Sequence, residues 1–103
     1  MNEDDILAEF RAASALLEGH FLLSSGRHSA FYLQCARVLM SPERAGKLAM
    51  AIAQKIPREL KSQIAAVISP AMGGLIIGHE MARALGVDAM FVERPDGVFG
   101  LRR

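Results

Sequence analysis

A short apolar run, followed by a glycine-rich turn and a helical pattern, constrains the fold of this chain more than any other feature. The run covers residues 65–68, and its aliphatic side chains and the Ser69-Pro70 that follows are typical of a fully buried β-strand. A turn over 70–74 leads into a helical pattern over 75–85, which Gly86 closes. This order directs unpaired backbone N–H groups and the positive end of a helix dipole toward one point, which favours an anion such as phosphate.

The turn contains two adjacent glycines, Gly73 and Gly74. Because they lack a Cβ, we expect them to allow left-handed backbone angles and a close approach to a ligand. The turn is not a Walker loop, since no Gly-Lys-Ser/Thr follows, and it lacks the Gly-x-Gly-x-x-Gly spacing of dinucleotide-binding loops. A tight strand-to-helix turn without a ligand fits this stretch equally well, so other segments must decide.

Length and composition indicate one folded domain. The chain has 103 residues, of which 51% are hydrophobic and 22% charged. The net charge of +1 marks no nucleic-acid or membrane surface, and no apolar stretch approaches the roughly 20 residues that span a bilayer. The first residues are acidic, unlike a signal peptide. The single cysteine, Cys35, fits a reducing compartment and is expected to be a buried, inert thiol. These features predict a cytoplasmic protein.

The first third of the chain predicts a helix and a β-hairpin. Apolar residues at helical spacing indicate an amphipathic helix over 3–17, which Gly19 ends. Two apolar or aromatic runs, 20–24 and 30–35, flank a Ser-Gly-rich centre over 25–29, as in a hairpin. The centre carries two hydroxyls, a guanidinium and an imidazole. It is either a solvated turn or a substrate loop that offers hydroxyl and backbone donors to an acidic ligand.

A second helix is predicted to begin at Pro42, with Ser41 as its N-cap, and to end at Pro57. Residues 58–63 read as a polar link. The buried stripe of this helix is predicted to consist of small and aliphatic residues: Ala45, Leu48, Ala49, Ile52 and Ile56.

A further buried strand is predicted over 89–92, and the strand, helix and strand form a βαβ unit with parallel strands. In an open α/β sheet, ligands bind outside the carboxyl ends of the strands. The turn over 70–74 and the loop that begins near Arg94 should therefore face the same crevice. His79, on the intervening helix, is expected at the surface or at the edge of the core.

Three segments, 21–32, 69–74 and 91–94 with its trailing loop, together resemble orotate phosphoribosyltransferase over essentially the whole chain. The resemblance implies an α/β fold of the type I phosphoribosyltransferase kind. An N-terminal helix and hairpin, residues 1–40, would form a hood, and residues 41–103 would form the first half of a parallel sheet flanked by helices. Together they would make a single incomplete domain.

The resemblance also implies an activity. The family transfers the ribose-5-phosphate of phosphoribosyl pyrophosphate (PRPP) to orotate, giving orotidine 5′-monophosphate and pyrophosphate in pyrimidine (UMP) biosynthesis, and Mg²⁺ accompanies the pyrophosphate. The anomeric carbon becomes cationic in the transition state, so no protein nucleophile is needed. The mobile loop reaches the neighbouring subunit's active site in this family, which implies a homodimer.

By position, two groups of site residues are implied. Those around orotate and the ribose are Ser25, Gly26, His28, Ser29, Tyr32 and Leu33. Those around the pyrophosphate are Ala71, Met72, Gly73, Gly74 and Arg94, to which we add Arg102 and Arg103 by hypothesis. No catalytic residue and no protein metal ligand are assigned.

The sequence departs from the family's common pattern. Ser24 and Gly73 stand where many members have lysines, and Pro95, Val98 and Gly100 replace the usual Lys, Lys and His. We expect Arg102 and Arg103 to supply the missing charge. The ribose-5-phosphate signature, two acids followed by Thr-Thr-Gly, is absent from a chain with no threonine. We therefore expect an N-terminal fragment with little activity of its own.

Two other functions remain open. One is a phosphoribosyltransferase-like regulator that binds a nucleotide without turnover, and the hairpin argues against it. The other is an interaction module whose glycine turn binds nothing.

Overall fold

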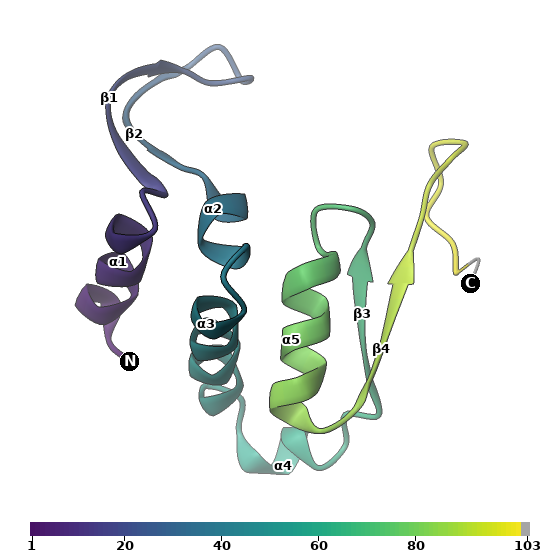
Figure 1. The fold of residues 1–103 in the computed structure, drawn as a ribbon. Coiled ribbons are helices and arrows are strands. Elements are labelled where there is room, and N and C mark those ends of the chain that lie inside the picture. The colour runs from purple at the N-terminus through teal and green to yellow at the C-terminus, as the bar shows by residue number, and fades with distance from the viewer. Residues whose placement is uncertain (102–103) are drawn as a thin grey trace. The chain divides into compact units, whose positions relative to one another are not determined.

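Helices and short strands are interspersed along the chain (Figure 1). The structure, a computed structural model, describes residues 1–101. These residues separate into two units, with the division between Arg44 and Ala45, and each unit is described by itself. The elements are α1 (Glu3–Ala12), β1 (Leu16–Leu22), β2 (His28–Leu33), α2 (Cys35–Leu39), α3 (Pro42–Gln54), α4 (Arg58–Lys61), β3 (Ala66–Pro70), α5 (Leu75–Leu85) and β4 (Asp88–Val92).

Helix α1 begins with a reciprocal cap that the sequence interpretation did not identify. Asn2 Oδ1 accepts a hydrogen bond of 2.8 Å from Asp5 N, and Asp5 Oδ2 accepts one of 3.0 Å from Asn2 N. The helix ends at Ala12, so the predicted end at residue 17 is wrong. Ser14 has φ 56°, a left-handed angle that a helix cannot continue through. The apolar residues that follow Ser14 belong to β1 instead.

Strands β1 and β2 form the predicted antiparallel hairpin, with Leu16 opposite Leu33 and Leu22 opposite His28. The register shifts between Glu18 and Phe21, as in a β-bulge. Gly19 lies inside this irregularity with φ 154°, so it does not end a helix as predicted. The hairpin is longer than expected, because β1 takes in residues assigned to α1.

The second strand of the hairpin leads directly into the short helix α2. Cys35 is the first residue of this helix and not the last residue of a strand. Its side chain is exposed, so the expected buried thiol is wrong. The buried residue of α2 is Val38, which supplies the largest fully buried side chain among the described residues.

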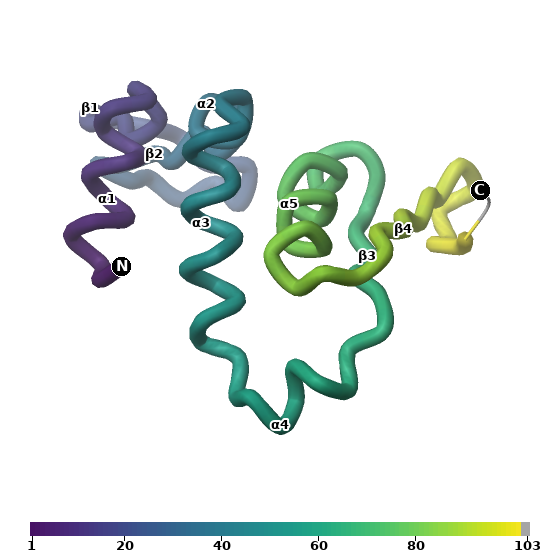
Figure 2. Tube along the Cα trace, turned by 60° about the horizontal axis from the view of Figure 1, so that its bottom comes forward, coloured from purple at the N-terminus to yellow at the C-terminus, as the bar shows by residue number. Residues whose placement is uncertain are grey.

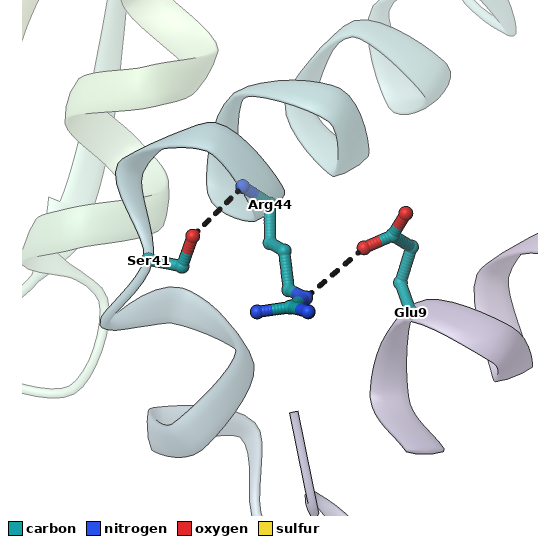
Figure 3. A network of polar contacts seen from close by, with 3 residues as sticks. All are labelled: Glu9, Ser41 and Arg44. Atoms are coloured by element: carbon teal, nitrogen blue, oxygen red, sulfur yellow. Dashed lines mark hydrogen bonds and ion pairs between the residues drawn. The ribbon is translucent and has the colours of Figure 1, made fainter. Parts of the chain in front are cut away.

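The start of α3 is held as its sequence predicts (Figure 3). Ser41 Oγ accepts a hydrogen bond of 3.3 Å from Arg44 N, the donor that an N-cap serine serves. The Arg44 side chain turns toward α1, where its Nε lies 3.2 Å from Glu9 Oε2. This is an ion pair whose direction does not meet hydrogen-bond geometry at Nε. Together these contacts link α1 to the start of α3.

The buried side of α3 differs from the predicted stripe. Ile52 is 46% exposed, and Ile56 lies beyond the end of the helix at Gln54. The buried residues are mostly alanines: Ala45, Leu48, Ala49, Ala51 and Ala53. After α3 the chain forms the single-turn helix α4, where the sequence suggested only a polar link.

Strands β3 and β4 are parallel, and α5 lies along both of them (Figures 1 and 2). The register places Val67 opposite Ala89 and Ser69 opposite Phe91. Helix and sheet meet closely at Gly78, where a Cβ would lie 2.6 Å from Ser69 Cβ. Gly86 ends α5 with φ 70°, as predicted. The βαβ unit with parallel strands is therefore confirmed.

The two strands are not fully buried, contrary to the prediction. Ile68 is 54% exposed and its partner in the register, Met90, is 38% exposed. Side chains alternate between the faces of a strand, so Ile68 lies on the face opposite Ser69, which α5 covers. Within the described part of the chain, a helix along one face leaves the other face open. No helix of residues 1–101 is long and apolar enough to cross a membrane.

Candidate functional site

The first group of predicted site residues lies on the hairpin of the first unit. Ser25 and Gly26 form its tip, which two backbone hydrogen bonds close: Leu23 N donates to Arg27 O at 2.8 Å, and Gly26 N donates to Leu23 O at 2.9 Å. Gly26 has φ 85°, an angle that suits glycine and explains its presence at the turn. Ser25 Oγ accepts a 3.4 Å hydrogen bond from Arg27 N, and its hydroxyl proton stays available to donate.

The polar side chains of His28 and Ser29 are engaged within the hairpin. His28 Nδ1 lies 2.7 Å from Nε2 of His20 on the other strand. Ser29 Oγ donates to Phe31 O at 2.8 Å and accepts from Phe31 N at 3.2 Å. These contacts order the start of β2. They also mean that the Ser29 hydroxyl proton is already donated in this structure.

Tyr32 and Leu33 present apolar surface near the end of β2. The Tyr32 ring packs 5.8 Å from the Phe21 ring, centroid to centroid, with the planes tilted by 35°. Both Tyr32 and Leu33 remain substantially exposed. Such a surface suits one face of a planar, conjugated ligand.

The second group, Ala71 to Gly74, lies between β3 and α5 in the second unit. Ala71 N donates to Val92 O at 2.9 Å, so the turn is attached to the end of the neighbouring strand β4. Gly74 N donates to Pro70 O at 2.9 Å, and Leu75 N donates to Met72 O at 3.1 Å. The peptide bond between Ala71 and Met72 is cis. The hydrogen bonds fold the chain back on itself between β3 and α5.

Several N–H groups of this turn have no acceptor within the described chain. They belong to Met72, Gly73, Ile76 and Ile77, none of which donates to a described backbone or side-chain oxygen. Two of them, Ile76 and Ile77, lie in the first turn of α5, where the helix dipole is positive. Such a set of donors is what an anion needs, and it lies where the sequence predicts an anion site; the site itself stays a prediction.

The two glycines of the turn have different roles. Neither has a positive φ, so the predicted left-handed angles are wrong. At Gly74 a Cβ would lie 2.7 Å from Pro70 Cδ and 2.9 Å from Pro70 O, so the turn closes only with glycine there. At Gly73 a Cβ would meet nothing within 4 Å. The close approach at Gly74 is thus to Pro70, and Gly73 faces open space.

Arg94 lies in the loop that follows β4. This loop leaves the sheet at the same edge as the glycine turn, because β3 and β4 are parallel neighbours. Its guanidinium lies over the Phe99 ring, 4.9 Å from the ring centroid. The segment between them is closed by two hydrogen bonds that link Glu93 and Gly100 at 3.0 and 2.8 Å. The sequence interpretation did not assign Phe99. The other two predicted arginines, Arg102 and Arg103, lie outside the described residues.

A cavity of about 310 Å³ lies beside α5. The residues that line it are mostly apolar: Ser69, Leu75, His79, Ala89, Met90 and Phe91. None of the four predicted turn residues, 71–74, is among them. His79 is exposed, as the sequence suggested. Residues 1–101 contain no group of three or more His, Cys, Asp or Glu side chains that is placed to hold a metal ion.

The structure thus brings the predicted residues together in two groups. The hairpin group lies in the first unit, and the glycine turn with Arg94 lies in the second. The sequence interpretation missed three partners of these residues, namely His20, Phe99 and Pro70. The only signal for His20 was its position in the strand that pairs with the one bearing His28.

Comparison with known proteins gives relatives in sequence and in structure. No family model matches the sequence. Orotate phosphoribosyltransferase of Novosphingobium aromaticivorans is 76% identical over all 103 residues, and that of Erythrobacter litoralis is 74% identical. The crystal structure of orotate phosphoribosyltransferase from Aeropyrum pernix matches with a TM-score of 0.74 and 25% identity, covering 94% of this chain and 56% of that one.

The fold is therefore that of a type I phosphoribosyltransferase, over about half the length of such structures. The sequence matches named above are all to proteins of one name, and they extend along the whole chain. Over its whole length the chain is similar to curated proteins named orotate phosphoribosyltransferase, and it spans about half of their length, 53% of each of the two named here.

Proposed function

We propose that this chain supplies the orotate- and pyrophosphate-binding elements of an orotate phosphoribosyltransferase. The reaction would move ribose-5-phosphate from PRPP to orotate and release pyrophosphate. The observation that carries the proposal is the glycine turn, with its unpaired N–H groups beside Arg94 in a chain 74% identical to an enzyme of that name. In the proposed reaction these groups would bind pyrophosphate, which is the leaving group.

The glycine turn would bind the pyrophosphate of PRPP. The N–H groups of Gly73, Ile76 and Ile77 would donate to phosphate oxygens, and Arg94 would leave Phe99 to pair with the same anion. Such donors stabilise the charge that grows on a departing pyrophosphate, so they act in the transition state as well as in binding. Arg102 and Arg103 would add positive charge in place of the lysines that many relatives have.

In this proposal Mg²⁺ arrives with the substrate. Mg²⁺ keeps several waters and is commonly held by substrate phosphates together with few protein carboxylates. A turn that offers backbone N–H groups leaves the remaining phosphate oxygens free for the ion. The protein residues named here would therefore bind the phosphates, and the ion would reduce their charge.

The hairpin would hold orotate and the ribose. The Ser25 hydroxyl is available to donate to a carboxylate, and the exposed faces of Tyr32 and Leu33 suit a planar pyrimidine. Gly26, His28 and Ser29 would shape this segment through the turn and the contacts described above. A homodimer in which a loop reaches the partner's site is a further part of the proposal, and it rests on the resemblance. A cytoplasmic location is also proposed, because a single cysteine fits a reducing compartment.

Ligand-dependent stability of the purified chain tests this function. A ligand at a hundred times its Kd raises the free energy of unfolding by about 2.7 kcal/mol, so thermal denaturation detects binding without turnover. We expect PRPP with Mg²⁺, and orotate, to raise the melting temperature, and a purine base to leave it unchanged. We also expect little formation of orotidine 5′-monophosphate by the 103 residues alone.

Two other results of the thermal denaturation would favour a different function. Stabilisation by a purine base but by neither PRPP nor orotate would favour a nucleotide-binding regulator. Stabilisation by none of the three would favour an interaction module and would contradict the proposal.

A further inference from the structure

The hairpin brings two imidazole rings into direct contact on its surface. His20 on β1 and His28 on β2 approach to 2.7 Å between Nε2 and Nδ1, and their ring centroids are 4.7 Å apart with planes tilted by 43°. Both side chains are exposed. The pair is diagonal across the strands, because Leu22, two residues from His20, is the residue opposite His28. One ring donates its N–H to the other, so two nitrogen atoms converge on one point.

Two convergent imidazole nitrogens are suitable ligands for a transition-metal ion. Zinc binds imidazole nitrogen at about 2.0–2.1 Å, so two such ligands on a tetrahedral ion lie roughly 3.3 Å apart. The present nitrogens would need to separate by about 0.6 Å from their hydrogen-bonded distance of 2.7 Å. Exposed side chains reach that spacing by small rotations about their side-chain bonds, without a change in the backbone.

The surroundings restrict which ion fits. Imidazole suits zinc, copper and nickel ions, whereas Mg²⁺ and Ca²⁺ require oxygen ligands. No described residue adds a third ligand to the pair, since residues 1–101 hold no group of three suitable side chains. Water or a small anion would therefore fill the remaining positions of the ion, as in zinc sites that keep an open position.

We propose that His20 and His28 form a two-histidine site for a borderline transition-metal ion, for which zinc is the probe. The ion would replace the shared proton of the histidine pair and cross-link β1 to β2. This site is separate from the Mg²⁺ of the proposed reaction in ligand chemistry, and it does not depend on that reaction.

Calorimetric titration of the chain with zinc at about pH 7.5, where imidazole is largely neutral, tests the proposal. The titration is done in a Cys35→Ser background, because the exposed Cys35 thiol is itself a zinc ligand. We expect saturable binding of one zinc ion per chain. His20→Ala and His28→Ala should each weaken it by at least about tenfold, since removal of even an indirect partner of a metal ligand costs that much.

The chain offers a matched control in its third histidine, His79, which is exposed on α5. His79→Ala should leave zinc affinity unchanged. His28→Gln keeps a polar side chain that is a poor zinc ligand, so it should lose zinc binding while the hairpin stays folded by circular dichroism. The proposal would be overturned by no saturable binding up to about 1 mM zinc, the weak end of specific affinities, or by binding that His20→Ala and His28→Ala leave intact.

Discussion

Gly78→Ala is expected to lower the free energy of unfolding by about 1–3 kcal/mol, the usual cost of overpacking a close contact. The new Cβ would lie 2.6 Å from Ser69 Cβ and would also collide with Ser69 Oγ. Ser69 is buried in β3, so it has little room to move. Helix α5 would have to lift from the sheet, and this cost exceeds the gain in helix propensity from alanine. Urea denaturation of the purified chain measures the difference.

Two companion variants show whether the Ser69 contact is the cause. Gly46→Ala places a methyl group in α3, where a Cβ would meet Glu80 Oε2 at 3.7 Å, an ordinary van der Waals contact, so it should be neutral or stabilise by up to about 1 kcal/mol. Ser69→Gly removes the atoms that collide, so Gly78→Ala in that background should cost little. An equal loss from Gly78→Ala with and without Ser69→Gly would contradict the described packing.

Gly74→Ala is expected to weaken pyrophosphate binding by about tenfold to a hundredfold. Gly74 has φ −94° and ψ −2°, which alanine adopts easily, so backbone freedom is not the issue. The obstacle is space, because a Cβ would lie 2.7 Å from Pro70 Cδ. The turn would open and misplace its N–H donors, each worth about 1.5–3 kcal/mol toward a charged acceptor. Calorimetric titration with Mg²⁺ and pyrophosphate measures the loss.

Gly73→Ala is the matched control for this variant. A Cβ at Gly73 meets nothing within 4 Å, and its backbone is not left-handed. Pyrophosphate affinity should therefore stay within about twofold of the starting chain, a difference of roughly 0.4 kcal/mol. Equal losses in the two variants, or none in Gly74→Ala, would contradict the role given to the turn.

The elements with strong local signals were predictable from the sequence. Residues whose preference acts within a few positions predicted the turn over 70–74, the presence of a hairpin and the end of α5 at Gly86. The strands of the hairpin run over 16–22 and 28–33, which differs from the predicted 20–24 and 30–35. The parallel pairing of β3 and β4 followed from the helix between them. Parallel strands end at the same edge of a sheet, so the sequence also predicts that the glycine turn and the Arg94 loop leave from one edge.

The errors arose where periodicity did not identify the element. Leu16 and Leu17 continue the helical spacing of α1, yet Ser14 adopts a left-handed angle and the chain becomes a strand. Ile52 and Ile68 are apolar but exposed, because burial depends on which faces are covered and not on the side chain alone. The spacing of apolar residues along a sequence shows neither the backbone angle at Ser14 nor which faces of α3 and β3 are covered.

The contacts within the candidate site also required three dimensions. The sequence places His28 in the hairpin but does not show that its imidazole meets His20. It places Arg94 after a strand but does not show that the guanidinium stacks on Phe99. It gives Gly73 and Gly74 the same chemistry, whereas their surroundings make Gly74 necessary and Gly73 replaceable.

Residue-resolved NMR titration shows whether the glycine turn binds the pyrophosphate of PRPP. We expect PRPP with Mg²⁺ to shift the amide signals of Gly73, Ile76 and Ile77 together with that of Arg94, along one saturating curve. A titration to millimolar PRPP that leaves those four signals in place, or that shifts only signals far from the turn, would contradict it.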